Sequence, residues 1–142
     1  MRFWDSSAIV PLIVEEACSS ACRSLLRTDR ALAVWTLSRV EVLSALWREV
    51  RAGAMERTAA TQAGRRLDAL SAAWTEVDGI VPVRDRAERL VAVHPLRAAD
   101  ALQLAAALVL SRERPRWPFV TGDRQLAGVA ELEGFDVIVP EG

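Results

Sequence analysis

The chain contains no lysine, so all 18 of its basic residues are arginines. A phosphoryl-accepting receiver or phosphatase-like domain also places acidic residues at strand ends, as this chain does, but it uses a lysine near the phosphate. The absence of lysine therefore argues against that class of protein.

Histidine and cysteine are nearly as scarce, because His94 is the only histidine and Cys18 and Cys22 are the only cysteines. One imidazole beside a proline supplies no Ser-His-Asp or Cys-His arrangement, and we expect His94 to begin a helix. These residues are also too few for a four-ligand zinc site. The cysteines lie four residues apart in an expected helix, which holds a disulfide badly, so we expect a reducing, cytoplasmic setting.

The sequence also lacks a long apolar span, a secretory signal, an internal repeat and a linker, so we expect no membrane segment. A length of 142 residues with 51% hydrophobic and 26% charged residues suits one domain, residues 1–142, with a real core. The net charge is only −1, so any nucleic acid would have to be bound by a local patch.

Short apolar runs alternate with helical patterns along the chain. Strands are expected at residues 2–5, 31–35 and 136–139, and a further strand is expected to end near Thr121. Residues 76–83 are expected to be extended, with a kink or turn at Asp78-Gly79. Helices are expected at residues 6–12, 17–27, 38–52, 55–74, 84–93, 94–112 and 124–133. The alternation predicts an α/β fold in which helices cover both faces of a parallel sheet.

Four acidic residues occupy positions where a folded chain usually avoids charge. Asp5 and Asp123 each end an apolar run, Glu41 lies beside an expected core stripe of one helix, and Asp100 interrupts a helix that is apolar almost all round. A buried carboxylate costs several kcal/mol unless it is protonated, paired or bound to a metal. Ligands of open parallel sheets bind at the carboxyl ends of the strands. We therefore expect these four side chains to meet around Mg²⁺ or Mn²⁺, which prefer oxygen ligands.

Each acid also has a simpler interpretation. Asp5 and Asp123 would cap the helices that follow them, and Glu41 would contact a helix N-terminus or pair with Arg48 or Arg39. Asp100 is the hardest to explain in this way, because it lies several residues past Pro95.

Several segments match one family in order and separation. They are Phe3-Trp4-Asp5-Ser6-Ser7-Ala8-Ile9-Val10, Ser38 to Ala45 with Glu41, His94 to Ala105 with Asp100, Phe119 to Leu126 with Asp123, and Gly134 to Val137. With these segments the chain resembles the PIN-domain nucleases, most closely the VapC-type toxins of bacterial toxin–antitoxin modules. The Asp78-Gly79 region has no clear counterpart.

The resemblance implies a three-layer α/β/α fold with a parallel sheet of four or five strands between helices. It also implies an acidic pocket that holds Mg²⁺ or Mn²⁺ and cleaves RNA phosphodiester bonds. It maps the catalytic and metal-binding acids onto Asp5, Glu41, Asp100 and Asp123, with Ser7 and Thr121 as supporting hydroxyls. It also implies a cognate antitoxin that blocks the pocket, and a homodimer.

Hydrolysis by metal-activated water suits these residue types, with the cation held by Asp5 and Asp100. Whether Asp123 and Glu41 bind a second cation or orient water stays open. Arg39, Arg97 and Arg124 each lie within three residues of a proposed acid, so they either hold RNA phosphates or serve as solvated or paired surface residues.

Two other functions fit the same fold. One is a PIN-like binding module without catalysis, against which the presence of all four acids argues. The other is an RNA-processing or DNA-cleaving nuclease that is not a toxin.

Overall fold

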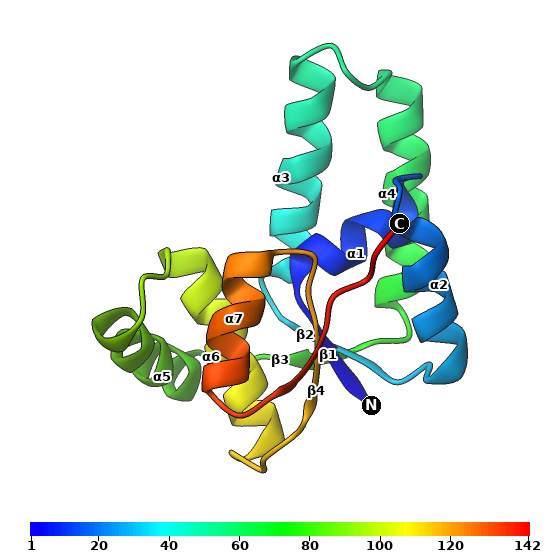
Figure 1. Cartoon of the computed structure of the whole chain (residues 1–142). Helices are drawn as coiled ribbons and strands as arrows, with labels where there is room; N and C mark the ends of the chain where they lie inside the picture. The colour runs from blue at the N-terminus through cyan, green and yellow to red at the C-terminus, as the bar shows by residue number, and fades with distance from the viewer.

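Five short strands form one parallel sheet in the order β3-β2-β1-β4-β5 (Figure 1). The computed structural model describes all residues, 1–142. The strands are β1 (Arg2–Trp4), β2 (Leu32–Trp35), β3 (Thr75–Val77), β4 (Pro118–Val120) and β5 (Asp136–Ile138). All four pairs of neighbouring strands are parallel, which confirms the expected parallel sheet.

Seven helices connect and cover these strands. They are α1 (Ser6–Ile13), α2 (Ser19–Thr28), α3 (Ser38–Arg51), α4 (Arg57–Ser71), α5 (Ile80–Val93), α6 (Ala98–Ser111) and α7 (Arg124–Leu132). None of them combines the length and the apolar character that crossing a membrane requires. With helices on both faces of the sheet, the predicted three-layer α/β architecture is confirmed (Figure 1).

Successive residues of the central strand β1 point into two separate cores. Phe3 stacks on Phe119 of β4 at 5.5 Å between ring centroids and joins the core under α5, α6 and α7. The next residue, Trp4, belongs with Val120 to the core under α1 to α4. Because side chains alternate across a strand, three residues of β1 are enough to bind both helical layers to the sheet.

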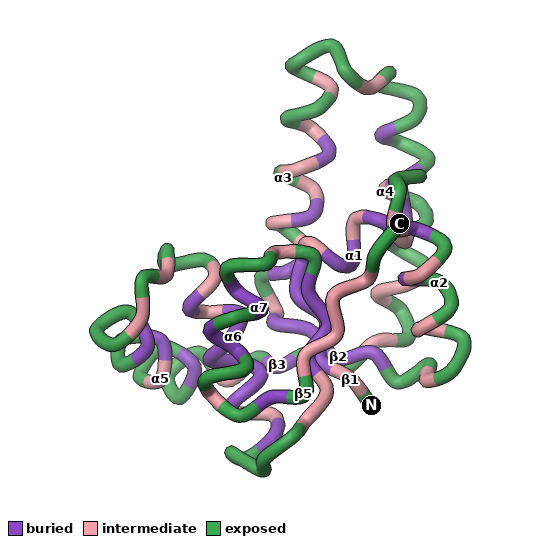
Figure 2. Tube along the Cα trace, viewed as in Figure 1, coloured by how far each residue is buried: buried purple, intermediate pink, exposed green.

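Helices α3 and α4 form a hairpin that projects beyond the rest of the molecule, and its far end is exposed (Figures 1 and 2). Only the base of the hairpin is anchored in the core, through Val42 and Leu46 of α3 and Ala63 and Leu67 of α4. The core stripe expected on α3 was wrong, because it was placed at Val40, Leu43, Trp47 and Val50. The buried apolar residues are offset from it by about one position, at Val42 and Leu46, and Val40 is 59% exposed.

The expectation of an extended segment through residue 83 was also wrong. Strand β3 ends at Val77, and Ile80 already begins α5. Pro82 is tolerated there because the first-turn N–H groups of a helix have no intrahelical partner. Val83, Ala87 and Leu90 then form the buried stripe of this helix.

His94 had been expected to begin a helix, but it ends α5 instead. Its backbone is extended (φ −121°, ψ 151°), which is the conformation favoured before a proline. Helix α6 begins only at Ala98, so Asp100 lies in its first turn. The His94 ring packs elsewhere, with Nε2 3.7 Å from a carboxylate oxygen of Glu133.

Candidate functional site

Asp5 follows β1 directly and is held almost entirely out of solvent, with 4% of its surface exposed. It caps α1, as the simpler interpretation of this residue expected, and its Oδ2 accepts hydrogen bonds from three donors. These are the Ser7 amide (3.3 Å), the Ser7 hydroxyl and the Thr121 hydroxyl (3.0 Å). Burial raises the pKa of Asp5, and repulsion from Asp100 adds to this, although the three hydrogen bonds oppose it.

Asp123 follows β4, the neighbour of β1, so the sheet brings it close to Asp5 in space. Its Oδ1 caps α7 by accepting from the amides of Gln125 (2.9 Å) and Leu126 (3.0 Å). Two hydroxyls connect the strand ends, because Ser7 Oγ accepts from the Gly122 amide (2.8 Å) and Thr121 Oγ1 from the Asp123 amide (3.0 Å). Both aspartates therefore do act as caps, and each cap uses a single carboxylate oxygen.

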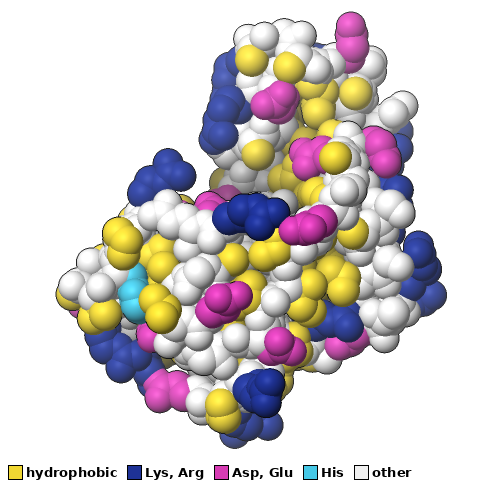
Figure 3. Space-filling model, viewed as in Figure 1, with side chains coloured by type: hydrophobic (Ala, Val, Ile, Leu, Met, Phe, Trp, Pro, Cys, Tyr) yellow, Lys and Arg dark blue, Asp and Glu magenta, His cyan; other side chains and the backbone are white.

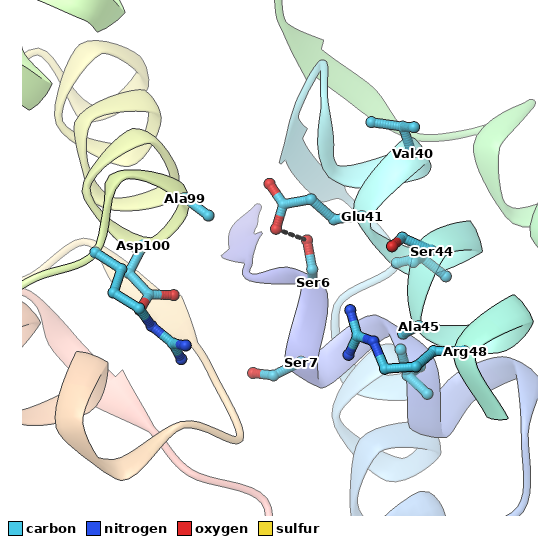
Figure 4. Close-up of a pocket in the computed structure, with 12 residues that line it drawn as sticks. Ser6, Ser7, Val40, Glu41, Ser44, Ala45, Arg48, Ala99 and Asp100 are labelled. Carbon is cyan, nitrogen blue, oxygen red and sulfur yellow. Dashed lines mark hydrogen bonds between the residues drawn. The ribbon is translucent and has the colours of Figure 1, made fainter. Parts of the chain in front are cut away.

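Glu41 lies in the first turn of α3 and is half-buried. Its Oε2 accepts from the Ser6 hydroxyl (3.2 Å) and its Oε1 from the Gln103 amide (3.3 Å). Burial raises its pKa, and repulsion from Asp5 and Asp100 raises it further. Figure 4 shows this carboxylate between Ser6 and the cleft.

Asp100 lies half-buried on the opposite side of the cleft from α3 (Figure 4). Burial and then repulsion from Asp123 raise its pKa, and Arg97 opposes the shift. Its place in the first turn of α6 gives it a favourable interaction with the helix dipole. The expected start of this helix at His94 had placed Asp100 too far inside the helix for such an interaction. Asp100 repels each of the other three acids.

A cleft of about 630 Å³ opens between the base of the α3–α4 hairpin and the start of α6. Glu41, Asp100 and Ser7 line it together with two arginines, Arg48 and Arg97. On the face shown in Figure 3, acidic and basic side chains gather at the waist between the hairpin and the body. Arg48 had been considered only as an ion-pair partner of Glu41. Its spacing of seven residues, two helical turns, was the signal that it shares the face of Glu41.

Arg39 and Arg124 lie elsewhere. Arg39 donates to Ser71 (2.8 Å) and pairs with Asp68 of α4, since a residue two positions before Glu41 points to another side of the helix. Arg124 pairs with Glu141 at 3.0 Å. Of the three arginines singled out in the sequence, only Arg97 lines the cleft.

No three His, Cys, Asp or Glu side chains lie close enough together to form a ready ligand set for a metal ion. Mg²⁺ nevertheless needs only one or two carboxylates when water and substrate phosphate complete its octahedron. The donors around the cleft are hydroxyl oxygens and carboxylates, and the negative charges of the carboxylates repel one another. This donor chemistry fits Mg²⁺ or Mn²⁺ and excludes softer, thiolate-preferring metals.

The fold and the site together define a class: parallel α/β proteins with an acidic cleft at the carboxyl ends of neighbouring strands. The sequence pattern of the PIN domain matches residues 2–132. The chain is also 33% identical over 141 residues to Ribonuclease VapC46 of Mycobacterium tuberculosis (strain ATCC 25618 / H37Rv), covering 97% of this chain and 96% of that protein. The chain therefore belongs to the PIN domain family.

Two solved structures share the fold. A toxin–antitoxin complex from Klebsiella pneumoniae matches with a TM-score of 0.68 and 18% identity, over 99% of this chain and 98% of that one. PAE2754 from Pyrobaculum aerophilum matches with a TM-score of 0.65 and 24% identity, over 89% of this chain and 82% of that one.

Proposed function

We propose that this protein, with residues 1–142 as one domain, is an Mg²⁺- or Mn²⁺-dependent endoribonuclease and the toxin of a type II toxin–antitoxin pair. The observation that carries this is a cleft lined by two acids, Glu41 and Asp100, and two arginines, with the buried Asp5 hydrogen-bonded to Ser7 of the same cleft. Full-length similarity to a protein named as a ribonuclease supports RNA as the substrate.

Asp5 and Asp100 would hold the cation, directly or through water, while Glu41 and Asp123 either bind a second cation or orient water. When bound, a divalent cation lowers the pKa of a water molecule and offsets the charge that grows on the phosphate. The Asp5 hydrogen bonds from Ser7 and Thr121 all go to Oδ2, so its Oδ1 stays available for this purpose. The two hydroxyls thus act as supports that fix the direction of one carboxylate.

Arg48 and Arg97 are the residues we propose to bind the RNA backbone. They line one cleft but come from different elements, α3 and the segment before α6, so an RNA strand in the cleft would be able to contact both guanidinium groups. Guanidinium groups match phosphate oxygens in charge and geometry. Arg39 and Arg124 are left out of this role because carboxylates of the chain already engage them.

The test is an RNA cleavage assay with Mg²⁺, Mn²⁺ or EDTA on the wild type and Asp100→Asn. Asp136→Asn is the matched control, since it makes the same change on an exposed residue of β5. We expect cleavage that requires metal, is lost in Asp100→Asn and persists in Asp136→Asn. Full activity of Asp100→Asn at equal metal would overturn the site. No cleavage and no metal binding by calorimetry would favour the binding module.

The role as a toxin requires a separate test in cells, where we expect a cytoplasmic location. Expression should arrest growth, and a small co-encoded antitoxin should relieve the arrest. Cleavage without growth arrest would instead favour the nuclease that is not a toxin.

We also propose a homodimer. Large apolar side chains at the starts of α3 and α5 are exposed, namely Leu37, Val40, Ile80 and Val81. Exposed apolar surface of this kind favours contact with another protein surface. Sedimentation of the purified protein measures the oligomeric state, and a monomer at micromolar concentration would contradict the proposal.

A further inference from the structure

Helix α6 carries one fully buried amide, that of Gln103, among seven other buried residues of which six are apolar. A buried amide costs free energy unless its polar atoms are hydrogen-bonded. Its position on the helix is therefore informative about the groups around it, which come from α1 and α3.

The Gln103 amide nitrogen lies close to three oxygen atoms, which share its two hydrogens. Nε2 lies 2.7 Å from Ser6 Oγ, 2.9 Å from Ser38 Oγ and 3.3 Å from Glu41 Oε1. The Ser6 hydroxyl in turn donates to the other oxygen of the same carboxylate, Oε2, at 3.2 Å. Both oxygens of Glu41 are thus held, one by Gln103 and one by a serine that Gln103 itself holds.

The carboxylate also determines which way the amide faces. An ionised carboxylate only accepts hydrogen bonds, so a Gln103 oxygen turned toward Glu41 would be repelled. With Nε2 toward Glu41, Ser6 accepts from the amide and keeps its own proton for Glu41. One orientation therefore satisfies Ser6, Gln103 and Glu41 together.

We propose that Gln103 is a positioning residue that fixes the Glu41 carboxylate at the edge of the cleft. This inference rests on the proposed function, because it gives Glu41 a role at the metal site. Gln103 does not line the cleft, so it acts through Glu41 and contacts neither RNA nor metal. The rival role is purely structural, in which Gln103 only ties α1, α3 and α6 together.

A mutant cycle on Mn²⁺ affinity separates the two roles. Gln103→Leu removes the amide at similar volume, and calorimetry with Mn²⁺ alone measures its effect in the wild-type and Glu41→Gln backgrounds. Partners of metal ligands typically contribute roughly 10–100-fold to affinity, so we expect a loss of that order in the wild-type background. In the Glu41→Gln background we expect no further loss.

Leu104→Val is the control, since Leu104 is the next residue and is fully buried, but it packs in the core under α5, α6 and α7. It should lower the unfolding temperature and leave the Mn²⁺ affinity unchanged. Gln103→Glu gives a readout without metal, because it sets two carboxylates against each other. In EDTA at pH 8 it should lower the unfolding temperature, and the exchange Gln103→Glu with Glu41→Gln should restore part of the loss.

Each remaining outcome contradicts a different statement. Wild-type Mn²⁺ affinity in Gln103→Leu, or an equal loss in both backgrounds, would overturn the positioning role and leave the metal site intact. A wild-type protein that binds no Mn²⁺ would overturn the metal site and, with it, this role of Gln103.

Discussion

Replacing Asp5 by asparagine tests whether the carboxylates are held at the expense of stability. The three donors around Asp5 all bind Oδ2, and the amide oxygen of an asparagine accepts from the same three groups. The substitution therefore removes the charge while leaving the hydrogen-bond geometry in place. We expect Asp5→Asn to stabilise the protein in EDTA at neutral pH and to abolish metal-dependent cleavage.

Two opposing contributions determine the size of this gain. Hydrogen bonds to a neutral acceptor are weaker than those to a carboxylate, by about 1 kcal/mol each. Burial of the charge acts in the other direction and is the larger contribution, since the pKa of Asp5 is raised in spite of those hydrogen bonds. We therefore expect a net gain in the free energy of unfolding, and each kcal/mol of gain raises Tm by about 3–4 °C.

The pH dependence follows from the same shift. The pKa of Asp5 in the folded protein is raised above its usual 3.8. At pH values between 3.8 and this raised pKa, the folded protein therefore binds more protons than the unfolded chain. Wild-type stability therefore falls as pH rises through that window. The advantage of Asp5→Asn should be absent at about pH 3.8 and below, grow above it and level off only above the raised pKa of Asp5 in the folded protein.

Thermal unfolding of both proteins in EDTA from pH 4 to pH 8 measures this difference, with Asp136→Asn as the exposed control. Adding Mn²⁺ should reverse the order, because at 100 times Kd a ligand stabilises the wild type by about 2.7 kcal/mol. An Asp5→Asn protein that is less stable at every pH, or that still cleaves RNA, would refute the reasoning.

Two further predictions concern the cleft and the backbone. Arg48→Ala should raise KM for RNA, leave kcat nearly unchanged and reduce the slope of log affinity against log salt by about one. Arg51→Ala on the same helix should have none of these effects. Equal effects of the two substitutions would contradict a cleft-specific contact. Gly134→Ala should cost about 1–2 kcal/mol in urea unfolding, because Gly134 has φ +94°. Gly128→Ala within α7 should instead stabilise by about 0.5–1 kcal/mol, because an added Cβ meets nothing within 4 Å there; a stabilising Gly134→Ala would be the contrary result.

Where the sequence predicted the fold correctly, the signal was local. Apolar runs that end in Asp5 and Asp123 predicted the ends of β1 and β4, and the alternation of strands with helices predicted the parallel sheet. Prediction from the sequence failed where one local pattern fits two structures. The apolar residues at the start of α5 fit a strand as well as a helix, and the preference of proline for a helix start misplaced the beginning of α6.

The site shows the same division. The residue types and their positions in apolar elements predicted four acids around one cation, which stays a prediction. In the structure three of these acids have raised pKa values, and Glu41 and Asp100 line the cleft. The interpretation of Asp5 and Asp123 as caps is equally correct, because one carboxylate has two oxygens and a cap uses only one of them.

The sequence by itself determined which residues carry negative charge at the ends of apolar elements, because burial preference and helix or strand periodicity are local properties of the chain. Only the tertiary structure decided that β1 lies beside β4, that Arg48 and not Arg39 faces the cleft, and that Gln103 holds Glu41. Each of these contacts joins different elements, so it depends on strand order and on the rotation of a helix about its axis, which no single stretch of sequence fixes.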